Sequence, residues 1–272
     1  MPTLMTNGIS LFYEVHGNPA NPPLLMVTGL GGIGSAWGRQ VERFAVDYFV
    51  IVPDHRGTGR TTHTLEGHTT AQLAADMASL LAYLGVGPAH IVGASTGGAI
   101  AQCMALDHPQ AVRTLTLSST WARFDAFTRA EFQARRKMAA EWDRAELYSA
   151  YALFLFSPRF WRENTQRVQA WIDRAVNNPQ QPDDRAIALA RIDMIMTHDT
   201  YARLHEIRHP TLVICADLNL CTPLPLSEEL AQGIPHAELV VIRDAGELLD
   251  IEKPDEFFDV VRSFIGRAGT RI

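Results

Sequence analysis

A serine in a glycine-rich turn is the residue of this chain best suited to covalent chemistry. Ser95 lies in GASTGG, residues 93–98, after the apolar run AHIV and before a stretch with helical periodicity. The pattern G-x-S-x-G between a strand and a helix is typical of a nucleophile elbow, a sharp turn that raises the serine hydroxyl to the tip of a sheet. The N-terminus of the following helix favours developing negative charge there. An incidental serine in a glycine turn would explain the five residues alone, but not the strand and helix around them.

A second glycine cluster could supply hydrogen-bond donors to that serine. The segment VTGLGGIGSAW, residues 27–37, follows another apolar run. We expect the backbone N–H of Leu30 to form an oxyanion hole with the N–H of Thr96, with Gly29 beside the substrate. A dinucleotide site is not favoured, because no G-x-G-x-x-G opens a helix with an acidic residue about 20 positions later. The third turn, DHRGTGRT at residues 54–61, is predicted to be structural.

Short apolar runs alternate along the chain with longer amphipathic segments. The runs are nearly continuous in hydrophobicity, as strands covered on both faces should be, and the segments between them carry helical periodicity. We therefore predict an α/β fold with a doubly wound, mostly parallel sheet that binds ligands at the carboxyl ends of its strands. The predicted strands cover residues 24–29, 48–54, 89–95, 112–119, 210–216 and 237–244, and the predicted helices cover residues 69–86, 96–109, 226–234 and 254–267.

The alternation is broken once, over residues 121–204. We predict that this stretch is a helical cap, or lid, inserted into a core formed by residues 1–120 and 205–272, because insertions at the functional edge commonly supply lids. A plain helical layer packed on the sheet is the alternative. Aromatic side chains of the insertion are candidates for contacting an apolar or flat substrate, although core packing explains them equally well. These candidates are Trp121, Phe154 and Trp161.

Composition restricts the partners of the protein. The chain has 272 residues, 47% of them hydrophobic, and a net charge of −6, which gives no support for binding to nucleic acid or an anionic membrane. No run approaches the roughly 20 apolar residues of a membrane span, and no signal peptide is recognisable. The three cysteines follow no metal spacing, which favours reduced thiols. We expect a cytoplasmic monomer or homodimer that takes a small-molecule substrate and needs neither a cofactor nor a metal.

From residue 9 to residue 267 the chain resembles the α/β-hydrolase superfamily, in the elbow, the TGLGG loop, DHRGTGRT and the inserted segment. It is most similar to the aminoacrylate hydrolases of pyrimidine degradation in GLGGIGSAW, LLAYLGV and ICADLNLCTP, and nearly as similar to enol-lactone hydrolases. The resemblance implies a serine nucleophile, an acid after the next-to-last strand and a histidine after the last strand. Ser95 matches the nucleophile. Asn219 stands at the acid position, with Asp217 two residues earlier, and Glu247 stands at the histidine position.

These two departures from the family pattern conserve charge. An aspartate with a neutral histidine carries one negative charge, and so does an asparagine with a glutamate. We expect the Asn219 amide to donate a hydrogen bond to Glu247. Desolvation should raise the pKa of this carboxylate, so that it acts as a general base on Ser95 or on water. His198, at the end of the insertion, is the alternative base and a candidate substrate contact.

Three functions are compatible with these residues. The first is a cofactor-free, serine hydrolase-like enzyme with an atypical triad, acting on a small, partly apolar ester, lactone, or amide- or enamine-like substrate. The second is a lyase or isomerase in which Glu247 moves a proton while the oxyanion hole holds an enolate. The third is a non-catalytic ligand-binding protein in which Glu247 marks a lost histidine. The retained serine and glycine loop argue against the third.

Overall fold

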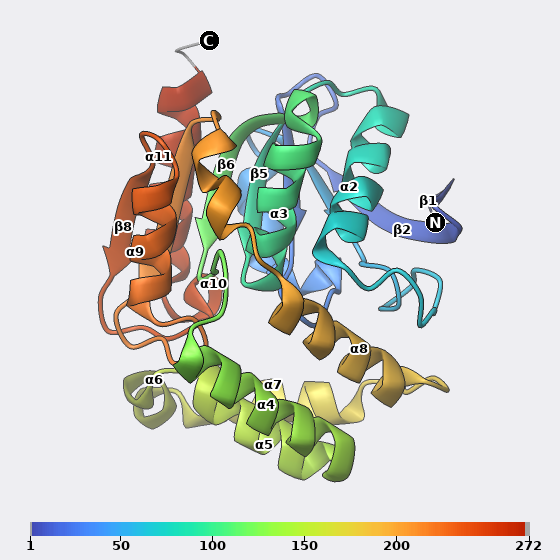
Figure 1. Ribbon diagram of the computed structural model, residues 1–272, viewed down its shortest axis with the longest axis vertical. Helices are drawn as coiled ribbons and strands as arrows, with labels where there is room; N and C mark the ends of the chain where they lie inside the picture. Colours follow the sequence, from blue (N-terminus) through green and yellow to red (C-terminus); the bar gives the residue numbers. More distant parts are fainter. Residues whose placement is uncertain (1, 270–272) are drawn as a thin grey trace.

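A computed structural model gives the structure of the protein and describes residues 2–269. Within this range the centre is a sheet of eight strands in the order β1-β2-β4-β3-β5-β6-β7-β8 (Figure 1). Strand β2 pairs antiparallel with both β1 and β4, whereas the other neighbours pair parallel. The strands are β1 (Thr3–Thr6), β2 (Ile9–His16), β3 (Pro23–Val27), β4 (Phe49–Pro53), β5 (Ala89–Ala94), β6 (Val112–Ser118), β7 (Thr211–Ala216) and β8 (Glu238–Ile242). The predicted doubly wound, mostly parallel sheet is confirmed.

Helices cover both faces of the sheet. On one face, α2, α3 and α9 pack apolar side chains such as Met77, Ile100 and Leu230 against the strands. On the other face, α1 and α11 do the same with Phe44 and Phe257. The helices of these layers are α1 (Arg39–Phe44), α2 (Thr70–Leu84), α3 (Thr96–Asp107), α9 (Leu224–Gly233) and α11 (Pro254–Gly269), with the short α10 (Leu249–Glu252) after β8. No helix within residues 2–269 is long and apolar enough to span a bilayer.

The chain between β6 and β7 contributes no strand to the sheet. It forms α4 (Ala126–Glu141), α5 (Arg144–Leu155), α6 (Pro158–Glu163), α7 (Thr165–Asn177), α8 (Asp184–Thr197) and the 3₁₀ helix η3 (Tyr201–Glu206). Helices α4 to α8 gather at one end of the sheet, the end to which the carboxyl terminus of β6 leads (Figure 1). A small apolar core that includes Phe156, Phe160 and Ile172 packs α5, α6 and α7 together. Helices α4 and α8 instead join the main core, through Phe132 and Ile192.

Candidate active site

Ser95 occupies a strained turn between β5 and α3. Its backbone angles, φ 53° and ψ −119°, are rare for a residue other than glycine, and such strain persists only where the surroundings impose it. The turn is tight, because a Cβ atom at Gly93 would collide with the backbone of Gly97, and one at Gly97 would collide with the carbonyl of Val27. Ser95 is partly exposed at the N-terminus of α3. The local geometry is therefore that of a nucleophile elbow.

The loop after β3 closely approaches Ser95. A Cβ atom at Gly29 would lie 3.3 Å from Ser95 Cβ and 3.9 Å from Ser95 Oγ. The carbonyl of Gly29 accepts a hydrogen bond of 3.0 Å from the N–H of Gly32, and the N–H of the same peptide plane, that of Leu30, points the opposite way. The N–H of Thr96, at the first position of α3, has no acceptor within its own helix. The N–H groups of Leu30 and Thr96 thus remain our candidates for an oxyanion hole.

Glu247 follows β8 and is 5% exposed. Asn219 Nδ2 and Thr222 Oγ1 each donate a hydrogen bond of 2.7 Å to the same carboxylate oxygen, Oε2. The Ser95 hydroxyl lies near enough to this carboxylate to favour its ionised form. Burial raises the pKa of Glu247 above its ordinary value, and the interactions with Ser95, Thr222 and Asn219 oppose the increase. The side chain beside the serine is therefore a desolvated carboxyl whose ionised form is supported by directed donors.

The inserted helices hold the turn that carries Glu247. The N–H of Glu247 donates a 3.1 Å hydrogen bond to the carbonyl of Leu155, at the end of α5. Gly246 has no room for a side chain, because a Cβ atom there would lie 2.8 Å from Ser157 N and 3.0 Å from the carbonyl oxygen of Leu155. The carboxylate of Glu252 accepts hydrogen bonds from the N–H and hydroxyl of Ser157, at 2.8 and 2.6 Å. Because of these contacts, the position of Glu247 depends on the insertion.

A buried group of charged side chains interacts electrostatically with Glu247. Arg135 of α4 is 4% exposed, and its Nη1 lies 3.2 Å from Glu131 Oε1 and 3.3 Å from Cys221 Sγ. Burial raises the pKa of Glu131 to about 7, against the opposing effect of Arg135. Burial also raises the pKa of Asp250 to about 7, and the charge on Glu247 adds to this shift. Glu131 and Asp250 therefore titrate near neutral pH, and each interacts with the charge on Glu247.

Asp217, the other carboxylate of the loop after β7, is engaged away from Glu247. Its Oδ1 accepts a 2.8 Å hydrogen bond from the N–H of Asp244, and its Oδ2 lies 3.5 Å from Arg243 Nη1. These contacts fasten the end of β8. We therefore leave Asp217 out of the proposed site and retain Asn219.

His198 is enclosed between helices. It is 5% exposed, its Nδ1 lies 2.9 Å from Thr70 Oγ1, and its Nε2 lies 3.5 Å from Thr200 Oγ1. Burial lowers its pKa to about 4, so the ring is neutral at physiological pH. Because both ring nitrogens have threonine partners, we include His198 neither as a base nor as a substrate contact.

The aromatic candidates of the insertion have different surroundings. Trp121 is fully buried, and Trp161 donates its indole N–H to the carbonyl of Ala152 at 3.1 Å. These contacts are those of core residues. Phe154 is partly exposed, and its ring centre lies 5.9 Å from the guanidinium carbon of Arg135. Phe154 is therefore the aromatic side chain that we retain as a candidate substrate contact.

Two residues of the site escaped the sequence analysis. Thr222 lies three residues after Asn219, and its N–H donates a 3.0 Å hydrogen bond to Asn219 Oδ1. Asparagine side chains often accept hydrogen bonds from backbone N–H groups a few residues later in a turn. This tendency of Asn219 could have identified Thr222 from the sequence. Arg135 gave no such signal, because an arginine in a helical segment is typical of a solvated face.

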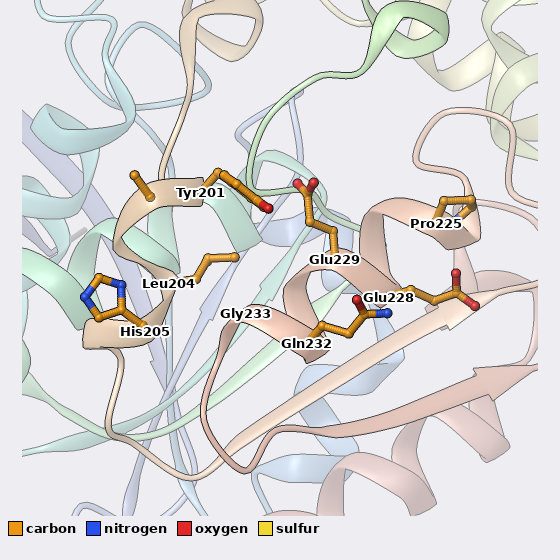
Figure 2. Close-up of a pocket in the computed structure, with 9 residues that line it drawn as sticks. Tyr201, Leu204, His205, Pro225, Glu228, Glu229, Gln232 and Gly233 are labelled. Atoms are coloured by element: carbon orange, nitrogen blue, oxygen red, sulfur yellow. The ribbon is translucent and has the colours of Figure 1, made fainter.

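A surface hollow of about 480 Å³ lies outside this site, between η3 and α9 (Figure 2). Neither Ser95 nor Glu247 lines it. We therefore assign it no part in the chemistry. Its lining side chains include Tyr201, Leu204, His205, Glu228, Glu229 and Gln232.

The sheet topology and the serine elbow are those of an α/β hydrolase, and comparison with known proteins agrees. Residues 22–254 match the family model described as alpha/beta hydrolase fold. The chain therefore belongs to the α/β-hydrolase family. The prediction that the protein is a hydrolase of this family is confirmed.

Curated relatives align over nearly the whole chain. The protein named "Putative carbamate hydrolase RutD" from Azorhizobium caulinodans is 34% identical over 266 residues, which cover 98% of each chain. A protein of the same name from Caulobacter sp. is 31% identical over 258 residues, 94% of this chain and 95% of its own.

Solved structures show the same architecture. The enol-lactonase from Burkholderia xenovorans has a TM-score of 0.87 at 25% identity, covering 97% of this chain and 100% of its own. A hydrolase from Pseudomonas aeruginosa has a TM-score of 0.87 at 27% identity, covering 97% and 98%. The expected similarity to enol-lactone hydrolases is thus confirmed.

Proposed function

We propose that the protein is a cofactor-free hydrolase in which Ser95 is the nucleophile and Glu247 is the general base. The observation that carries this proposal is the placement of the Glu247 carboxylate. The carboxylate is buried beside Ser95, and one of its oxygens accepts hydrogen bonds from Asn219 and Thr222. Because both 2.7 Å donors use Oε2, the other oxygen, Oε1, is left for the serine proton or a water.

The proposed reaction proceeds in two steps. In the first, Glu247 takes the proton of the Ser95 hydroxyl as Oγ bonds to the substrate carbonyl carbon. The N–H groups of Leu30 and Thr96 stabilise the resulting oxyanion. The carbonyl re-forms, the bond to the leaving oxygen or nitrogen breaks, and Glu247 returns the proton to the leaving group. In the second step, Glu247 deprotonates water, which cleaves the acyl-Ser95 ester and restores the serine hydroxyl.

Burial suits Glu247 to this task. A carboxylate at its reference pKa of about 4.3 is a weak base towards a serine. Desolvation raises the pKa of Glu247, which strengthens it as a base, while the donors from Asn219 and Thr222 keep enough of it ionised. In this arrangement Asn219 orients the base by donating a hydrogen bond to it, whereas the aspartate of the usual triad accepts one from the histidine.

The substrate class that we propose is a small ester, lactone, or carbamate- or amide-like compound with an apolar part. The names of the relatives support this class, since they refer to a carbamate hydrolase and an enol-lactonase. We also propose that residues 121–204 act as a lid over Ser95. Contacts from this segment to the catalytic loops support the lid: Glu247 N to the Leu155 carbonyl, Cys221 Sγ to the Phe154 carbonyl and Arg191 Nε to the Leu30 carbonyl.

Turnover of 4-nitrophenyl acetate, an enol lactone and a phenyl carbamate by the purified protein tests the proposal. We expect hydrolysis of at least one, a mass increase on Ser95 with a fluorophosphonate probe, and loss of both in Ser95→Ala. Labelling of Ser95 without turnover of any probe would point to a lost activity. Isomerisation without hydrolysis and without a Ser95 adduct would favour proton transfer on an enolate by Glu247.

A further inference from the structure

A buried arginine of the insertion reaches the proposed oxyanion loop. Arg191 lies on α8 and is 2% exposed. Within residues 2–269 its guanidinium group forms no ion pair with a carboxylate, and its hydrogen-bond acceptors are two backbone carbonyls and an imidazole nitrogen. A charge without an acidic partner is expensive to bury unless its donors are fully used. The cost shows in its pKa, which burial lowers to about 10.

The guanidinium group of Arg191 donates hydrogen bonds to two loops at the carboxyl ends of strands, the loop after β3 and the loop after β4. Its Nε donates to the carbonyl of Leu30 at 2.9 Å, its Nη1 to the carbonyl of Arg56 at 3.4 Å, and its Nη2 to His55 Nδ1 at 3.1 Å. Because a guanidinium can only donate, Nδ1 of His55 must be the acceptor and the ring must be neutral. Burial and the charge of Arg191 lower the pKa of His55 well below its ordinary value, in agreement with a neutral ring.

These bonds fix both peptide planes that flank the α-carbon of Leu30. The plane before it is held by the hydrogen bond from Gly32 N to the carbonyl of Gly29, and the plane after it by Arg191. The direction of the Leu30 N–H follows from these two constraints. The fit is close, since a Cβ atom at Gly32 would lie 2.8 Å from Arg191 Nη2.

We propose that Arg191 is a positioning residue that holds the Gly29–Gly32 turn in the shape required of an oxyanion hole, so that docking of α8 completes the active site. This inference rests on the proposed function in one respect, the assignment of the Leu30 N–H to the oxyanion. A lysine at position 191 has the same charge but cannot reach three acceptors at once. The test therefore keeps the positive charge at position 191 and changes the geometry of its hydrogen bonds.

The experiment compares Arg191→Lys with a control on the same helix, Ile192→Ala, which removes buried apolar contacts but none of the three hydrogen bonds made by Arg191. In 4-nitrophenyl acetate hydrolysis, Arg191→Lys should lower kcat about 10- to 100-fold with KM within about threefold. This is less than the roughly 100- to 1000-fold cost of losing an oxyanion donor, because the Leu30 N–H is displaced and not removed. Hydrogen exchange of the peptide spanning residues 28–36 should become faster in Arg191→Lys. Ile192→Ala should lower Tm while keeping kcat within about threefold and leaving that exchange rate unchanged.

If the hydrogen-exchange rate of residues 28–36 in Arg191→Lys equals that of wild type, the inference is overturned at any value of kcat. Faster exchange with wild-type kcat, or the same losses in Ile192→Ala, also overturns it. If the wild-type protein neither hydrolyses the probe esters nor reacts with fluorophosphonate, the proposed function fails. The exchange rates then still decide whether Arg191 holds the turn.

Discussion

Replacing Thr222 with valine removes one donor from the Glu247 carboxylate while almost preserving the shape of the side chain. Thr222 is fully buried, and its hydroxyl donates to Glu247 Oε2 at 2.7 Å while accepting from Asn219 Nδ2 at 2.8 Å. A hydrogen bond to a charged group contributes about 1.5–3 kcal/mol. This contribution supports the ionised form of Glu247, so its loss should shift the protonation equilibrium about ten- to a hundredfold towards the neutral acid.

The measurable consequence is a shift of the acid limb of the kcat/KM profile to higher pH in Thr222→Val. Above the limb, kcat/KM should stay within a few-fold of wild type, because the more basic carboxylate is then ionised. Glu131 and Asp250, each with a pKa raised to about 7 by burial, likewise titrate above the ordinary range of a carboxyl group. The assignment to Glu247 therefore depends on the difference between variants.

The matched control is Thr222→Ser, which keeps the hydroxyl and loses only a methyl group. Its acid limb should coincide with that of wild type. Coincident limbs in wild type, Thr222→Val and Thr222→Ser would refute the reasoning, because they would mean that the titrating group is not the one that Thr222 holds.

Three further outcomes are expected. Gly29→Ala should reduce kcat about tenfold or more with little change in Tm, because the new methyl group lies 3.3 Å from Ser95 Cβ; an unchanged kcat would count against close approach of this loop to the reacting serine. Burial raises the pKa of Glu247, so the wild-type protein should lose stability as pH rises through that pKa. Glu247→Gln should then have the higher Tm at pH 8, with the difference shrinking below about pH 4, where the carboxyl is protonated in both states; a lower Tm at pH 8 would contradict this. The double variant Glu247→His/Asn219→Asp should hydrolyse 4-nitrophenyl acetate faster than Glu247→His alone, since only the former supplies a carboxylate to orient the imidazole; equal rates would show that the two positions do not cooperate.

The sequence predicted the parts of the molecule that depend on local pattern. The buried parallel strands appear as continuous apolar runs, and the glycines around Ser95 specify a turn that larger residues cannot adopt. The hydrogen bond expected from Asn219 to Glu247 is present in the structure. These features could be predicted because each depends on residues that are neighbours in the chain or that occupy known positions of the fold.

The remaining features depend on contacts between distant segments. Strands β1 and β2 were not predicted, because at the antiparallel end of the sheet their burial is uneven and their apolar signal is weak. Arg135 and Arg191 belong to helices of the insertion whose periodicity says nothing about which loop they meet. A buried arginine is recognised by its acceptors. Those of Arg191 lie far away in the sequence, and Arg135 meets the distant Cys221 besides the nearby Glu131.

The central claim is that Glu247 activates Ser95, and the rate of covalent modification of Ser95 by a fluorophosphonate measures that activation directly. Measured by intact mass from pH 4 to pH 9, the wild-type rate should rise through an acid limb above the ordinary range of a glutamate, as the raised pKa requires. In Glu247→Gln, whose amide cannot accept the serine proton, the rate should fall at least 100-fold and lose this limb. The same rate and the same pH dependence in both proteins would contradict the account.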